Sequence, residues 1–218
     1  MNLLVFTSFH LPPHFVAINM EIIQQNIDAG HNVTVLDCRS SFSGCGFNPY
    51  KLKYMCEICK FRESDGLKLI QGNYKRLSIK DIISREDENK ADIFLDKIQL
   101  IDKDLTFENF DVGESVLSSH ISKTREREFN NEDDQKILRE LTSNSIITYL
   151  SIRRFIHEEN IEKVSLFNGR WDYYRAALSA ARIENLDVEI FEKFRYGGYY
   201  ENYGNYLPHD MLLVLCPQ

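Results

Sequence analysis

The sequence predicts an α/β fold, a Rossmann-like, mostly parallel sheet flanked by helices. Leu3–Phe6 and Val33–Leu36 are short, continuous apolar runs, which are typical of strands buried on both faces of a parallel sheet. Gly30 lies between them as a helix C-cap, and the residues before it show an apolar face at helical spacing (Val16, Met20, Ile23 and Ile27). The segment up to Asp37 is therefore expected to be a β-α-β unit with a right-handed crossover.

A second strand–helix–strand unit is predicted near the carboxyl end. Val164–Phe167 has the pattern of a short buried strand, Trp171–Ile183 that of a helix, and Val188–Phe191 that of the next strand. Because parallel strands end at one edge of a sheet, we expect the loops that follow the strands of both units to emerge together.

The middle of the chain is predicted to be less regular. Asp37–Gly66 is rich in Cys, Ser, Gly and aromatic residues, and we expect an irregular Cys-containing insertion of loop or short helix. Leu67–Ile70 is expected to form a strand. Lys80–Asp104 is expected to hold a helix and a connection, and Asp111–Ser119 a turn into a short helix. Asn131–Glu159 is expected to be a long helical stretch. No clear linker is visible, so residues 1–218 are predicted to form a single Rossmann-like domain.

Charge and hydrophobicity narrow the function classes. The formal net charge of −7 argues against general nucleic-acid binding, because such proteins present basic surfaces to phosphates. No apolar run approaches the roughly 20 residues that span a membrane. The start, Met1–Phe6, lacks the basic region and cleavage site of a signal peptide, so the protein is expected to be cytoplasmic.

Polar residues at two predicted strand ends are candidates for ligand binding. Asn168, Gly169 and Arg170 combine an amide, a close-approach backbone and a fork of donors, which suits an anionic or sugar-like ligand. Glu192 follows the next strand. His10 lies in the loop after the first strand, which has no Gly-x-Gly-x-x-Gly, so a dinucleotide cofactor is not expected. The alternative is that these loop residues only cap and turn.

Four cysteines lie within one short segment, in the pattern Cys-x6-Cys-x10-Cys-x2-Cys (Cys38, Cys45, Cys56 and Cys59). The last two have the separation with which two thiolates hold one tetrahedral zinc, so a structural zinc bound by all four is one hypothesis. Unligated thiols that pack a loop are the second hypothesis, and redox chemistry is the third.

The segment Arg195–Tyr206 contains five tyrosines and three glycines and is expected to be a loop. Aromatic rings with polar tips suit sugars, so Tyr199 and the nearby His209 are candidate ligand contacts. The alternative is that these tyrosines pack against the sheet.

Several short motifs follow one another along the chain, each occurring once. They are Cys45…Asn48-Pro49…Cys56-x-x-Cys59, Gly113–Ser119, Asn168-Gly169-Arg170 with Arg175, Glu192, and Pro208-His209-Asp210. Together with the opening strand and helix, they resemble the amino-terminal half of bacterial capsule and lipopolysaccharide biosynthesis glycosyltransferase-like proteins, which have a two-domain GT-B fold.

The resemblance implies the acceptor-side domain of a glycosyltransferase in surface-polysaccharide biosynthesis. A second domain would hold the nucleotide-sugar donor, and the chain ends where that domain would begin, so the isolated chain is expected to be inactive. In the assembled cleft, Arg170 would hold an anionic group, Asn168 a sugar hydroxyl, and Glu192 or His10 would act as general base. Further substrate contacts are expected from the remaining candidates (Gly169, Arg175, Tyr199 and His209).

The expected partners are a sugar acceptor or nucleotide-sugar and no nucleic acid, with peripheral membrane association left open. The alternative function is a non-catalytic nucleotide- or sugar-phosphate-binding α/β module with a structural zinc.

Overall fold

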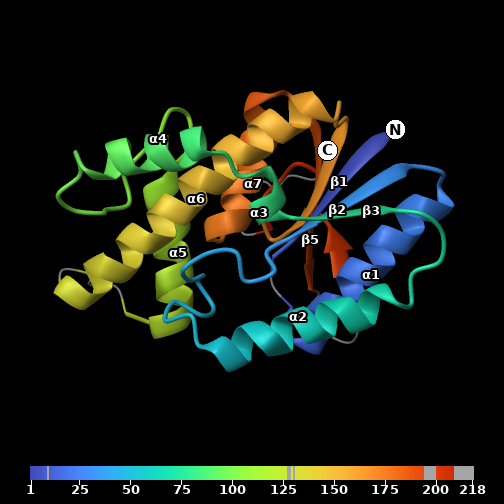
Figure 1. Cartoon of the computed structure of the whole chain (residues 1–218), viewed down its shortest axis with the longest axis horizontal. Helices are drawn as coiled ribbons and strands as arrows, with labels where there is room; N and C mark the ends of the chain where they lie inside the picture. The colour runs from blue at the N-terminus through green and yellow to red at the C-terminus, as the bar shows by residue number, and fades with distance from the viewer. Residues whose placement is uncertain (9, 127–128, 130, 194–199, 209–218) are drawn as a thin grey trace.

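The computed structural model describes residues 1–8, 10–126, 129, 131–193 and 200–208 and has an α/β fold with a mostly parallel sheet (Figure 1). Six strands form this sheet in the order β3-β2-β1-β4-β5-β6. Their bounds are β1 Asn2–Thr7, β2 Asn32–Asp37, β3 Lys75–Ser78, β4 Lys163–Phe167, β5 Asp187–Lys193 and β6 Tyr200–Asn202.

The first strand lies in the middle of the sheet. Val5 of β1 is opposite Val35 of β2 on one side and opposite Ser165 of β4 on the other, and both pairings are parallel. The β2–β3 and β4–β5 pairings are also parallel, whereas β6 runs antiparallel to β5. The strand order therefore reverses between β1 and β4, and the carboxyl ends of the five parallel strands share one edge.

Seven helices accompany these strands in the described part of the chain: α1 Pro13–Asp28, α2 Lys53–Leu67, α3 Ile79–Ile82, α4 Arg85–Leu95, α5 Val112–Thr124, α6 Glu132–Glu158 and α7 Asp172–Ile183. Helices α1 and α2 pack together, and α6 packs against α4, α5 and α7 (Figure 1). The close approach of α2 to α1 depends on Gly66, because a Cβ there would lie 2.8 Å from the Val16 side chain. None of the described helices is long and apolar enough to cross a membrane.

The two predicted strand–helix–strand units are confirmed, and so is the long helix expected within Asn131–Glu159. Gly30 follows α1 with a φ of +79°, and its N–H donates to the Ile27 carbonyl, as expected of a residue that ends a helix. The prediction of a single domain for residues 1–218 stays a prediction.

Two predictions for the middle of the chain are wrong. In Asp37–Gly66, residues 38–52 are loop and turn as expected, but Lys53–Gly66 is regular and belongs to the 15-residue helix α2 instead of a short helix. Leu67–Ile70 is not a strand, because Leu67 ends α2, and the strand comes later, at Lys75–Ser78. The sequence was misread because α2 exposes aromatic residues and buries Glu63 and Gly66, so its apolar residues do not mark a buried face.

The predicted tyrosine-rich loop is partly a strand. Tyr200–Asn202 forms β6, which extends the sheet beyond β5. Residues 194–199 and 209–218 lie outside the described residues, and Tyr199 and His209 are among them.

Candidate functional site

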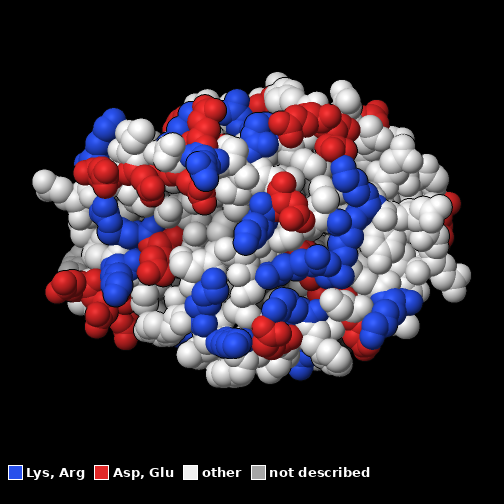
Figure 2. Space-filling model, in the orientation of Figure 1, with Lys and Arg blue, Asp and Glu red and all other residues white. Residues whose placement is uncertain are grey.

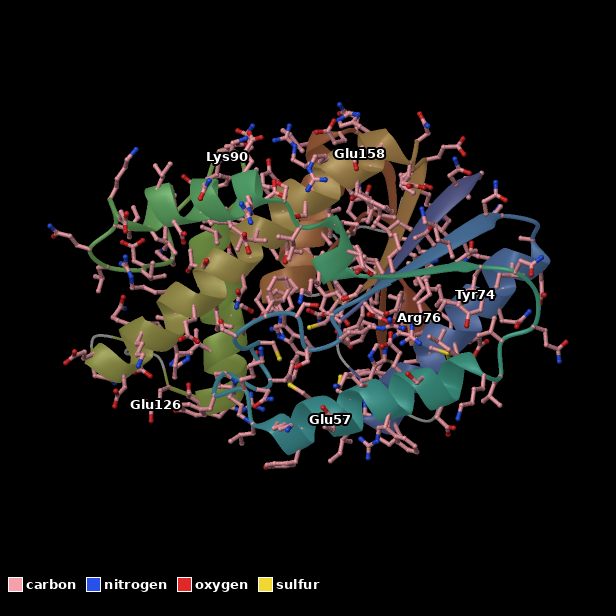
Figure 3. All side chains as sticks on the ribbon, in the orientation of Figure 1. Glu57, Tyr74, Arg76, Lys90, Glu126 and Glu158 are labelled. Atoms are coloured by element: carbon pink, nitrogen blue, oxygen red, sulfur yellow. The ribbon has the colours of Figure 1, made fainter. Side chains whose placement is uncertain are left out.

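A pocket lies at the carboxyl ends of β1 and β2 and is bordered by α2. Three segments line it: the loop after β1, the loop after β2, and the inner face of α2 (Ser8, His10, Leu11; Cys38, Arg39, Ser40, Cys45, Asn48; Met55, Cys56, Cys59, Lys60, Glu63). Figure 3 shows sulfur atoms gathered between α2 and the segment that follows β2. The position agrees with the general rule that ligands bind outside the carboxyl ends of parallel strands.

His10 lies at the centre of the pocket's polar groups and is almost fully buried. Its Nε2 is 3.2 Å from the Asn19 amide nitrogen and 3.6 Å from Glu63 Oε1. Burial lowers the pKa of His10 to about 3, and the positive charge of Arg76 adds to this effect. The imidazole is therefore neutral at physiological pH, with one ring nitrogen as a donor and the other as an acceptor.

The other ring nitrogen of His10 faces a thiol. Cys59 Sγ is 4.0 Å from His10 Nδ1 and also accepts a hydrogen bond from the His10 backbone N–H at 3.3 Å. Cys59 and Glu63 are four residues apart on α2, so both project from the same face of the helix. Cys59, His10 and Glu63 thus form a line in which the imidazole lies between a thiol and a carboxyl group.

The carboxyl group of Glu63 belongs to a buried acidic pair that shares one arginine. Arg76 donates to Glu63 Oε2 at 3.1 Å and to Asp37 Oδ2 at 2.9 Å, and Thr7 donates to Glu63 Oε1 at 3.0 Å. Burial and the nearby charge of Asp37 raise the pKa of Glu63 to about 8, although Arg76 opposes both effects. Burial also raises the pKa of Asp37, against the charges of Arg76 and Arg39. Arg76 is shared between the two carboxylates, and the partly exposed Arg39 reaches only Asp37. Burial outweighs these cations, so the pair holds a proton near neutral pH.

The four cysteines border one pocket, but they do not form a metal site in the described part of the chain, where no group of three potential metal ligands converges. All four are free thiols. Burial raises the pKa of Cys38 to about 11, that of Cys59 to about 12, and that of Cys45 well above its ordinary value. Because no three of these ligands converge among the described residues, the structural zinc proposed for the alternative function is not supported.

Asn168, Arg170 and Glu192 lie at the ends of β4 and β5, outside the residues that line the pocket around His10. The Asn168 amide contacts the Glu192 carboxylate, and the Asn168 Oδ1 accepts from the Arg170 backbone N–H at 3.1 Å. Asn168 and Gly169 both have positive φ, 62° and 68°. The Arg170 guanidinium lies 5.7 Å from the Trp171 ring centre. Asn168, Gly169 and Arg170 thus form the turn that joins β4 to α7, and Asn168 connects this turn to Glu192 on β5.

Of the three remaining candidates, one is placed by the structure. Arg175 makes a two-pronged ion pair with Asp111, which ties α7 to the start of α5. That pairing occupies its guanidinium within the fold. Tyr199 and His209 lie outside the described residues.

Sequence analysis missed Glu63, Asp37, Arg76 and Asn19. Asp37 and Arg76 come from neighbouring strands, and Asn19 comes from α1, so their convergence depends on tertiary structure. Glu63 had a usable signal: Cys56, Cys59 and Glu63 are spaced at i, i+3 and i+7, the spacing of one helix face.

No family model matches the chain, and no curated protein is similar to it. Among solved structures, a cyclodipeptide synthase (CDPS) from Fluoribacter dumoffii is similar with a TM-score of 0.52 and 12% sequence identity, covering 93% of this chain and 90% of that protein. A teicoplanin deacetylase in complex with teicoplanin gives a TM-score of 0.44 and 17% identity, covering 95% of this chain and 76% of that protein. At 12% identity the likeness to the synthase shows a shared fold alone.

The resemblance to GT-B glycosyltransferases is therefore wrong. The solved structure that is similar with a TM-score of 0.52 is a cyclodipeptide synthase and not a GT-B glycosyltransferase. The expected role in capsule or lipopolysaccharide biosynthesis rested on that resemblance and is wrong as well. Short motifs misled because turns after parallel strands favour Asn, Gly and Asp in many unrelated proteins of this class.

Proposed function

We propose that this protein catalyses acyl transfer through a thioester on Cys59. The observation that carries the proposal is the line formed by Cys59, His10 and Glu63, in which the imidazole contacts a thiol through one nitrogen and approaches a carboxyl group through the other. A nucleophile, a base and a group that orients the base are the three parts that covalent acyl transfer uses in unrelated folds.

The reaction follows from the protonation states. In the structure the Asn19 amide N–H faces His10 Nε2, which therefore accepts. When this amide turns its Oδ1 to the ring and Glu63 is ionised, the His10 proton is held on Nε2, so that Nδ1 accepts the Cys59 proton as Sγ attacks the acyl carbon. The carbon–leaving group bond then breaks, and the leaving group takes the proton from His10. The products are the acyl thioester and the protonated leaving group. An amine that attacks the thioester gives an amide and restores the thiol.

The surroundings of Cys59 support this role. Burial keeps Cys59 protonated at neutral pH, so it needs a base at the moment of attack, as a serine nucleophile does. The His10 backbone N–H already donates to Sγ and stabilises the negative charge that develops there. The Asn19 Oδ1 is buried and has no partner among the described residues, so rotation of this amide would give the Nε2 proton a second acceptor.

The fold adds an analogy. A cyclodipeptide contains two amide bonds between two amino acids, so the synthase with a similar fold performs acyl transfer by definition. At 12% identity this carries over only as an analogy of reaction class. We also infer a Rossmann-like sheet from the reversal of strand order between β1 and β4. The free thiols favour a reducing, cytoplasmic setting.

Intact-mass spectrometry of the full chain tests the proposal. The protein is mixed with a small leucyl thioester, and an increase in mass by one leucyl group is expected. Cys59→Ala should abolish the adduct. Cys56→Ala is the matched control, because Cys56 lies on the same helix and borders the same pocket but contacts Asn48 instead of His10. Equal labelling of both variants, with the adduct elsewhere, would refute the role of Cys59.

Ser8 is the second candidate nucleophile, because it borders the same pocket directly after β1. An adduct that persists in Cys59→Ala and disappears in Ser8→Ala would keep acyl transfer and reassign the nucleophile. The pH dependence tests Glu63. Initial acylation should rise about tenfold per pH unit up to about pH 8, and Glu63→Gln should remove this rise.

A further inference from the structure

The outer face of α2 carries an exposed apolar stripe. Tyr54, Ile58 and Phe61 are spaced at i, i+4 and i+7, and 63%, 40% and 66% of their surfaces are exposed. Tyr50 and Leu52, directly before the helix, are exposed as well. Five of the ten large exposed hydrophobic residues in the described part of the chain thus fall within a stretch of twelve. Such clustering marks an interaction surface, whereas scattered apolar residues need no explanation.

Basic side chains flank this stripe. The stretch from Lys51 to Arg62 contains Lys51, Lys53, Lys60 and Arg62 against one acidic residue, Glu57, which is exposed and pairs with Lys60 at 2.7 Å. Figure 2 shows Lys and Arg side chains gathered over α2 and the adjoining strands, with the acidic Glu57, labelled in Figure 3, among them. The chain as a whole carries a net charge of −7, so this basic region has the opposite sign to the rest of the protein.

We propose that the outer face of α2 docks on an anionic lipid bilayer, with the helix lying in the plane of the interface. Tyrosine and phenylalanine rings suit the boundary between headgroups and acyl chains, and lysines beside them reach the lipid phosphates. Charge complementarity selects this partner, because the basic flanks would meet negative charge on the bilayer surface.

The other partners fit less well. In a symmetric dimer this face would meet its own copy, and Lys51 and Lys53 would then oppose like charges. Single-stranded nucleic acid would stack on Tyr54 and Phe61, but it gains little from the aliphatic Leu52 and Ile58. A bilayer uses the aromatic, aliphatic and basic side chains together.

Docking in this orientation has a consequence for the pocket. The inner face of the same helix lines the pocket with Met55, Cys56, Cys59 and Glu63, so the pocket would lie close behind the bilayer surface. Binding to lipid depends only on the outer face and stands whether or not Cys59 is a nucleophile.

Vesicle flotation of the full chain tests the proposal. Binding is expected to vesicles of phosphatidylcholine with phosphatidylglycerol and to be much weaker to phosphatidylcholine alone. Phe61→Ser and Tyr54→Ser should each weaken binding roughly tenfold through lost apolar contact. Lys53→Glu should weaken it at least about fivefold, and added salt should act in the same direction. Ile93→Ser is the control, because Ile93 is 57% exposed but lies on a different helix, α4.

Three outcomes would overturn the proposal. The first is no binding to either vesicle by a protein whose melting curve shows that it is folded. The second is equal loss of binding in Phe61→Ser and Ile93→Ser. The third is a protein that does not bind vesicles but binds polyuridylate, or self-associates in sedimentation, and loses that binding or self-association when Tyr54 or Phe61 is replaced.

Discussion

Two arginine–carboxylate clusters in this protein have opposite effects on proton binding. In the first, Arg154 donates to Asp87 at 2.7 Å, and in the second Arg76 serves both Asp37 and Glu63. Burial pulls the pKa of Asp87 upward, but hydrogen bonds from Arg154 and the capping serine outweigh it and leave the pKa below its ordinary value. In the second cluster the pKa of Glu63 rises to about 8.

The difference comes from the depth of burial and from a second carboxylate at close range. Asp87 is a single carboxylate that accepts from Arg154, from the Ser84 backbone and from the Ser151 hydroxyl. It also completes the capping box of α4, so its ionised form is fully satisfied. Glu63 and Asp37 are more deeply buried than Asp87 and lie side by side, so burial and the second carboxylate outweigh the shared Arg76 at Glu63. A cluster of the first kind holds helices together, whereas one of the second kind stores a proton and marks a candidate site of acid–base chemistry.

The largest effect is expected at Asp87. Asp87→Ala removes three hydrogen bonds and leaves Arg154 without its main partner, so the free energy of unfolding should fall by about 3 kcal/mol. Urea unfolding at pH 7 measures this. Asp92→Ala on the exposed side of α4 is the control and should change stability by less than about 0.5 kcal/mol. Similar losses in both variants would mean that the first cluster is not structural.

Ionisation of Glu63 should destabilise the folded protein, whereas the ionised Asp87 stabilises it. Its pKa is about 8 in the folded protein and near 4.5 when unfolded, so between these values the folded state keeps a proton that the unfolded state has released. The free energy of unfolding should therefore fall as pH rises from 5.5 to 7.5, by up to about 2.5 kcal/mol. Glu63→Gln should lose this dependence, as urea unfolding at the two pH values would show. Parallel curves for both proteins would contradict the raised pKa.

His10 should make the fold sensitive to acid. Its pKa is about 3 in the folded protein and near 6.5 when unfolded, so below pH 6.5 the unfolded state binds a proton that the folded state refuses. This should cost about 2 kcal/mol between pH 6.5 and pH 5. His10→Gln keeps a polar group in place and should flatten that part of the profile. His31→Gln, on the loop after α1, serves as the control.

The smallest effect is expected at the rim of the second cluster. Arg39 lies 3.2 Å from Asp37 and its side chain is 42% exposed, so solvent screens the pair. Arg39→Gln should lower the free energy of unfolding by less than about 1 kcal/mol. Arg76→Gln, measured beside it by thermal melting, should cost clearly more, because it leaves two buried carboxylates without their shared cation. Equal losses of stability in the two variants would show that Arg39 and Arg76 stabilise the carboxylates equally.

The sequence predicted those parts of the fold in which local pattern and burial agree. The strands at Leu3–Phe6 and Val164–Phe167 are apolar runs that become fully buried, so they were recognised. Helix α2 was missed because one of its faces meets solvent with aromatic rings while the other lines a pocket. Strand β3 was missed because Lys75 and Arg76 make half of it charged, as suits an edge strand.

The candidate site was only half visible in the sequence. The sequence predicted His10 in a crevice with Asn168, Arg170 and Glu192 and the four cysteines as a separate zinc site, whereas the structure brings His10 and the cysteines to one pocket. Their protonation could not be predicted, because it depends on how deeply Glu63 is buried and on the charges of Asp37 and Arg76 around it. Distances across three strands and a helix decide those values, and no spacing in the sequence contains them.

The central position of β1 has a consequence for synthesis of the chain. Its partner β2 follows within about thirty residues, since Leu3 pairs with Val33, but its other partner pairs Leu3 with Lys163. While the ribosome makes the intervening segment, one side of the apolar strand Leu3–Phe6 has no neighbour. An uncovered strand edge of this kind is prone to pair with other chains. Folding of this protein during translation should therefore depend on shielding of its first strand until β4 has emerged.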